Sequence, residues 1–114
     1  MRELEEVGLI VPKGDYGYSL TFYVKNDDAG ETVFDLTDYT VTLKLWPAGR
    51  AGAPYLSGVC VIEDAVAGKC YYTIKSGDLD KVGIFSLELQ MTKTGKKEST
   101  RSYQLQVTES PSAV

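Results

Sequence analysis

Short runs in which apolar and polar residues alternate recur along this 114-residue chain, and Gly, Asp, Asn or Pro separate them. In the run at 40–46, Val41, Leu43 and Leu45 alternate with polar residues. Because successive side chains of a strand point to opposite faces, such a run buries one face and exposes the other. Helical spacing is hard to find. The sequence therefore predicts an all-β protein, a β-sandwich of about seven to eight strands.

The alternation places eight strands, at residues 7–11, 17–25, 32–36, 40–46, 55–62, 69–75, 83–92 and 99–108. With 43% hydrophobic residues in 114, the chain is long enough for one core and too short for two. We therefore predict a single domain over residues 1–114, in which 109–114 forms a tail or the start of a linker.

Three hairpins follow, because paired strands must turn their apolar sides to the same face. The last one turns at Lys96 beside Gly95, and its predicted pairs are Phe85–Val107, Leu87–Leu105, Leu89–Tyr103 and Met91–Arg101. The middle one has the predicted pairs Leu56–Ile74, Gly58–Tyr72, Cys60–Cys70 and Ile62–Gly68. In it, the ring of Tyr72 would cover a cross-strand glycine. The first has the predicted pairs Val24–Phe34 and Phe22–Leu36.

Two irregular segments lie between the first and the middle hairpin. In the first, Asp35 or Asp38 can bond its own backbone and turn the chain, with Leu36 as an apolar plug at the corner. The second, WPAGRAGAP at 46–54, begins where Pro47 removes a ladder donor, and we expect it to cross from one sheet to the other.

Charge and composition exclude several functions. The net charge of −4 and the scattered Lys and Arg residues argue against a nucleic-acid partner. No apolar run is long enough to cross a bilayer, and the N-terminus does not resemble a secretory signal, so we expect no membrane partner and no export. Histidine is absent, which removes the commonest general base and metal ligand.

The two cysteines, Cys60 and Cys70, face each other in the predicted register. In an oxidising compartment a disulfide is geometrically allowed there. Without an export signal, two buried thiols that act as small apolar side chains are the favoured interpretation. Zinc would need two further ligands, so we expect none.

Acidic residues gather in turns, namely Asp27, Asp28, Asp78 and Asp80. Calcium favours such oxygen-rich loops, but the regular spacing of an EF-hand loop is missing, and turn formation accounts for these residues. Glycoside hydrolysis needs convergent carboxylates, whereas Glu88 is on an outward strand position. We expect no catalytic residue, no metal and no cofactor, and therefore no enzyme.

Eight tyrosines and one tryptophan are the most informative surplus. By parity, Tyr18, Tyr72 and Tyr103 belong to the core or its rim. Five residues on the opposite parity form the candidate interface: Tyr23, Trp46, Val59, Val61 and Tyr71. Outward aromatic rings serve either a sugar platform or a protein contact. The valines favour a protein contact, because aliphatic area does little for sugars.

The order of features over residues 15–108 resembles the N-terminal immunoglobulin-like domain of the phage upper baseplate protein (BppU) family. The matching stretches are residues 27–46, 58–92 and 96–107. The most distinctive parts are Gly68-Lys69 before a strand that contains Tyr72 and Ile74, and Gly83 before Phe85.

This resemblance implies an immunoglobulin-like antiparallel β-sandwich in a viral structural protein of a phage or prophage tail or baseplate. Such a protein docks onto other tail or baseplate subunits, carries a host-recognition element, resides in the virion and needs no cofactor. The domain in this family usually continues into helical linker or receptor-binding regions. The resemblance therefore leaves two alternatives, a full protein or a fragment of a longer one. We also expect a homo-oligomer. The alternative is a carbohydrate-binding module with Tyr23, Trp46 and Tyr71 as its platform, for which a glycan is the partner.

Overall fold

The computed structural model describes residues 3–4, 9–14, 16–25, 32–47, 55–100 and 103–109, and every regular element within these ranges is a β-strand. The strands are β1 (Glu3–Leu4), β2 (Leu9–Pro12), β3 (Ser19–Lys25), β4 (Thr40–Pro47), β5 (Leu56–Val59), β6 (Val61–Asp64), β7 (Lys69–Thr73), β8 (Gly83–Lys93), β9 (Lys96–Ser99) and β10 (Tyr103–Thr108).

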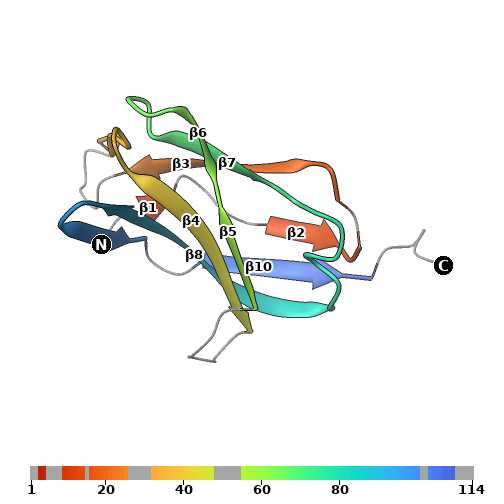
Figure 1. Ribbon diagram of the computed structural model, residues 1–114. Helices are drawn as coiled ribbons and strands as arrows, with labels where there is room; N and C mark the ends of the chain where they lie inside the picture. Colours follow the sequence, from red (N-terminus) through yellow and green to blue (C-terminus); the bar gives the residue numbers. More distant parts are fainter. Residues whose placement is uncertain are drawn as a thin grey trace.

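The strands form two layers (Figure 1). A four-stranded sheet has the order β1-β3-β7-β6, and a six-stranded sheet has the order β2-β10-β8-β4-β5 with β9 beside β8. In the lettering of immunoglobulin domains these are A-B-E-D and a sheet that contains G-F-C with an added C′ strand. Among the described strand pairs, only β2 with β10 is parallel. The predicted immunoglobulin-like β-sandwich is confirmed.

The strands differ from the prediction in four places, and the structure describes ten strands where seven to eight were expected. The two-residue β1 was not predicted. The run 55–62 is divided into β5 and β6, and the run 99–108 contains β10 preceded by β9. Residues 32–36 do not form a strand but make a single bridge, Lys25 to Val33. The short strand is lost because the corner at Asp35 begins within it.

The core lies between the two sheets and follows the predicted alternation. In β4 and β8, the inward pairs are Val41–Met91, Leu43–Leu89 and Leu45–Leu87, and all six side chains are buried. The other sheet contributes Phe22 and Val24 from β3 and Cys70 and Tyr72 from β7. Tyr18 and Tyr103 pack against this core as half-buried rings, as expected for rim residues.

The predicted register of the last hairpin is wrong by two residues. Leu105 pairs with Phe85 and Tyr103 with Leu87, so each inward residue keeps its face but meets a different partner. The cause is the turn: Lys93 pairs with Lys96 across Thr94 and Gly95, whose φ is 78°. One extra residue then enters before β10, because Ser99 pairs with Gln90 whereas Tyr103 pairs with Leu87.

The middle hairpin is also corrected. Ile62 pairs with Cys70, and only β6 pairs with β7, whereas β5 belongs to the other sheet and pairs with β4. The chain crosses between the sheets at Cys60, whose N–H donates to Val41 O at 2.8 Å. The expected contact of Tyr72 with Gly58 is present, but it spans the sandwich: a Cβ on Gly58 would lie 2.3 Å from Tyr72 Cε1.

The expected crossover at 46–54 is therefore wrong. β4 and β5 flank this segment and are antiparallel neighbours in one sheet, with Leu45 opposite Leu56. Residues 48–54 lie outside the described residues, but the strands on either side of them belong to the same sheet. The chain instead changes sheets where β5 runs into β6 (Figure 1), at Cys60. Pro47 is the last residue of β4, as its missing donor predicts.

The corner at 35–39 is confirmed in the version that uses Asp35. Its Oδ1 accepts the N–H of Thr37 at 2.9 Å and the hydroxyl of Thr37 at 2.6 Å. Asp38 takes the left-handed conformation with φ 67°, and Leu36 is fully buried. The predicted proximity of Val24 and Phe34 is confirmed by a 3.0 Å hydrogen bond from Phe34 N, whereas Leu36 N donates to Ala65 O instead of joining β3.

Gly58→Ala is expected to lower the free energy of unfolding by about 1–3 kcal/mol, as overpacked cores do. The new methyl group would clash with Tyr72, and the ring is held in place because its hydroxyl donates a 2.6 Å hydrogen bond to Asp78. Chemical denaturation measures the change, with Ser57→Ala as the exposed control. In a Tyr72→Leu background the cost of Gly58→Ala should shrink; an equal cost in both backgrounds would contradict the contact.

Asp35 is expected to contribute to the pH dependence of stability. The hydrogen bonds from the hydroxyl and then the N–H of Thr37 lower the pKa of Asp35 below its usual value. A carboxyl whose pKa is depressed in the folded state stabilises at pH above its unfolded pKa, and this contribution is lost as pH falls through the folded value. Asp35→Asn keeps an acceptor but does not titrate. Melting temperatures of the two proteins should converge on acidification; a constant difference would contradict the role of the charge.

Candidate docking surface

The five candidate interface residues lie on two different sheets. Tyr23, Val61 and Tyr71 are on β3, β6 and β7 of the four-stranded sheet, whereas Trp46 and Val59 are on β4 and β5 of the six-stranded sheet. Each of them alternates with buried residues and points away from the core. The structure therefore groups three of them and separates the other two, and the suggested sugar platform of Tyr23, Trp46 and Tyr71 does not form one surface.

The three grouped residues lie on neighbouring strands. Val61 pairs directly with Tyr71, and Tyr23 is two residues from Thr21, which pairs with Tyr71 from the other side. Val61 is 52% exposed and Tyr23 is 37% exposed. We call Tyr23, Val61 and Tyr71, together with the ion pair Glu63–Lys69, the outer face of the four-stranded sheet.

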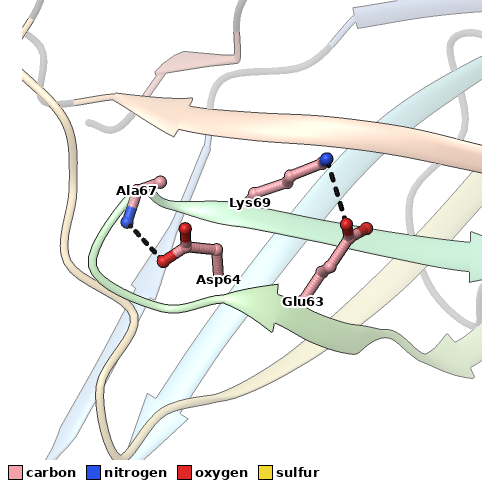
Figure 2. Close-up of polar contacts among 4 residues, drawn as sticks. All are labelled: Glu63, Asp64, Ala67 and Lys69. Carbon is pink, nitrogen blue, oxygen red and sulfur yellow. Dashed lines mark hydrogen bonds and ion pairs between the residues drawn. The ribbon is translucent and has the colours of Figure 1, made fainter.

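A charged pair completes this outer face. Lys69 pairs with Tyr23 in the sheet, and its Nζ lies 5.8 Å from the centre of the Tyr23 ring. The same Nζ makes a 3.1 Å ion pair with Glu63 (Figure 2). The hydrogen bond and charge of Glu63 raise the pKa of Lys69, and Tyr23 adds to the effect. Aromatic, aliphatic and charged groups are thus side by side, as in many protein interfaces.

The turn between β6 and β7 holds this face in place. Asp64 Oδ1 accepts the N–H of Ala67 at 3.2 Å (Figure 2), and Gly68 N donates to Ala65 O at 3.0 Å. Gly68 has φ 69°, and a Cβ there would lie 2.6 Å from Val24 O. Glycine is needed because the turn both reverses the chain and touches the backbone of β3. The Gly68-Lys69 motif therefore has a structural cause.

The outer face of the six-stranded sheet carries apolar residues that the sequence analysis did not select. Ile10 and Ile84 are 68% and 48% exposed and flank Gln106, which pairs with both. Trp46 pairs with Ser86 on the same face. The signal was present in the sequence, because Ile84 has the opposite parity to the buried Phe85. Glu88 pairs with Lys44 at an outward position, as expected.

The two aspartates of the turn at 78–80 accept hydrogen bonds from tyrosine hydroxyls of the same chain. Asp78 Oδ2 accepts the hydroxyl of Tyr72 at 2.6 Å and the N–H of Lys75 at 2.8 Å, and Asp80 Oδ1 accepts the hydroxyl of Tyr55. Burial, followed by the bond to Asp78, raises the pKa of Tyr72, and burial likewise raises the pKa of Tyr55. Asp27 and Asp28 lie outside the described residues. In the described part, no three metal-ligating side chains gather.

Both cysteines are buried and carry free thiols. They are not directly paired as predicted, since Ile62 rather than Cys60 is opposite Cys70. The thiols nevertheless meet in the core, and the hydrogen bond between them, together with burial, raises the pKa of Cys60. The arrangement matches the favoured interpretation of two small apolar side chains.

Comparisons with known proteins give no family assignment: no protein-family model matches the chain, and a search of curated proteins finds no match. Within the described residues, no helix is long and apolar enough to cross a membrane.

The thiols are expected to resist modification in the native protein. A buried thiol with a raised pKa reacts only when the structure opens, so its reaction with Ellman's reagent should be at least about a hundredfold slower than after unfolding. Both thiols should react in guanidinium chloride. Rapid labelling of the native protein would contradict their burial, and no labelling of the unfolded protein would reveal a disulfide, which intact mass before and after reduction would verify.

Proposed function

We propose that this chain is a non-enzymatic assembly module of a phage or prophage tail or baseplate. It docks onto other virion proteins through the outer face of the four-stranded sheet and carries a host-recognition element. The protein is made in the bacterial cytoplasm and resides in the virion.

The observation that carries this proposal is the grouping of outward-facing side chains on three adjacent strands. Val61 and Tyr71 form a direct cross-strand pair, and Tyr23 lies beside them. Tyrosine provides large contact area and a polar hydroxyl, which makes it one of the residues that contribute most at protein interfaces. The pair Glu63–Lys69 lies at the side of this group and supplies polar contacts that fix orientation.

The tail or baseplate assignment comes from the sequence. Motif order over residues 15–108 resembles the N-terminal domain of the phage upper baseplate protein family, and an immunoglobulin-like sandwich is the fold which that resemblance implied. A docking role needs an exposed face on a folded scaffold, and the four-stranded sheet has such a face.

Tyr71→Ala is expected to weaken docking by at least about tenfold, because removal of a central aromatic side chain from an interface typically has this effect. The measurement is co-purification, and then calorimetry, of the chain with the proteins encoded beside it. Ile84→Ser is the matched control, because it removes an exposed apolar residue from the opposite sheet.

Two results would contradict the proposal: none of the neighbouring gene products binds, or Tyr71→Ala binds as well as the wild type. Binding to a glycan panel, with no protein partner, would favour the carbohydrate-binding alternative. Melting temperatures of both variants verify that lost binding is not lost folding.

A further inference from the structure

The outer strands of the two sheets differ in how they are protected against pairing with another chain. Among the described strands, β1 has only two residues, β6 carries Glu63 and Asp64 and an irregular register, and β2 ends at Pro12. Short length, charge, irregularity and proline all discourage strand addition. β5, residues Leu56–Val59, is as short as β2 and β6 but has no charge, proline or irregularity: its sequence is LSGV and its four register pairs with β4 are regular.

The backbone of β5 also has groups that point away from its only described neighbour. In an antiparallel pair, alternate residues direct their N–H and C=O groups to the same partner strand. Cys60 N donates to Val41 O, so the even-numbered positions bond to β4. The N–H and C=O groups of Ser57 and Val59 therefore point to the opposite side, where the described residues contain no strand.

Side-chain parity limits how a further strand can add. Ser57 and Val59 are exposed, whereas Gly58 faces the ring of Tyr72 in the core. An added strand must match outward with outward positions, or its apolar side chains would reverse faces. Gly58 also has no side chain, and Ser57 has a small one, so another backbone can approach closely.

We propose that β5 pairs antiparallel with β5 of a second copy of this chain. Gly58 lies opposite its own copy at the two-fold axis, and Ser57 lies opposite Val59 of the second copy. Both Ser57–Val59 contacts are then hydrogen-bonded pairs, and two six-stranded sheets join into one. The alternative with Ser57 opposite its copy would need Tyr55, whose N–H already donates to Leu45 O at 2.7 Å.

A second copy is the occupant that the charge pattern favours. In a two-fold contact the same patch of both copies meets itself, so an edge whose charges all have one sign meets like charges. The four residues of β5 are uncharged and can meet themselves without repulsion. On β6, Glu63 and Asp64 would oppose acidic copies, in a chain whose net charge is already −4.

The test is sedimentation velocity and light scattering over a concentration series up to the millimolar range. The wild type should dimerise reversibly. Ser57→Lys combined with Val59→Lys should raise the dimer dissociation constant by about tenfold or more, because two symmetric pairs of like charges are placed opposite each other.

Ser57→Glu combined with Val59→Lys should restore the dimer, because the proposed register places opposite charges together at both contacts. In the rejected register, the glutamates would instead oppose each other. Val61→Lys is the matched control: it is the same substitution at an exposed valine two residues away, on the other sheet, and should leave the dimer unchanged.

A wild type that stays monomeric throughout would overturn the proposal, and so would a dimer that the double lysine variant leaves intact. If that variant fails to fold by circular dichroism, Ser57→Glu combined with Val59→Glu makes the same comparison against Val61→Glu, because like charges again lie opposite each other. The proposed dimer is independent of docking to tail proteins. Tyr71→Ala should weaken docking and keep the dimer, whereas the double lysine variant should weaken the dimer, so the two proposals can fail separately.

Discussion

The pairing of β4 with β8 is the contact on which the rest of the structure depends. Its eight register pairs bury three consecutive inward pairs of aliphatic and methionine side chains. Each such side chain contributes about 1.5–3 kcal/mol through burial. Three further strands of the six-stranded sheet attach directly to this pair: β5 to β4, and β9 and β10 to β8. Backbone hydrogen bonds to the same two strands also hold the chain where it leaves β5 and β9. They run from Cys60 N to Val41 O and from Thr100 N to Leu89 O. The Thr100 hydroxyl in turn accepts the N–H of Leu89, which satisfies a buried polar side chain.

The change of sheet at Cys60 determines which surfaces the chain presents. A single residue separates β5 from β6, and it bonds to β4 while the next residue pairs with β7. Val59 and Val61 therefore face solvent on different sheets, although both have the same parity. The buried Cys60 side chain between them meets Cys70 and needs little space, which suits a point where the two layers come together.

Local pattern predicted the faces of the strands well and their partners less well, and the reason is geometric. A shift of two residues leaves every side chain on the same face, so alternation could not distinguish Leu105 from Val107 as the partner of Phe85. Likewise, alternation continues unbroken through residues 56–62 although the chain changes sheets there, so one long strand was predicted. The corner at Asp35 was predictable because its hydrogen bonds are local. For the five candidate interface residues, strand parity correctly predicted that they point outward. It could not predict that they lie on two sheets, because that depends on the change of sheet at Cys60.

The contrast between β5 and β6 follows from what their side chains already do. On β6, Glu63 holds Lys69 and Asp64 caps the turn, so the charges that shape the outer face also keep that edge from adding strands. On β5, packing requires Gly58 beneath the Tyr72 ring, and Ser57 and Val59 carry no charge. Residues 56–64 thus contain the charged edge strand β6, next to the face proposed for docking, and the neutral edge strand β5, proposed to pair with its own copy. The two proposed contacts use different sheets.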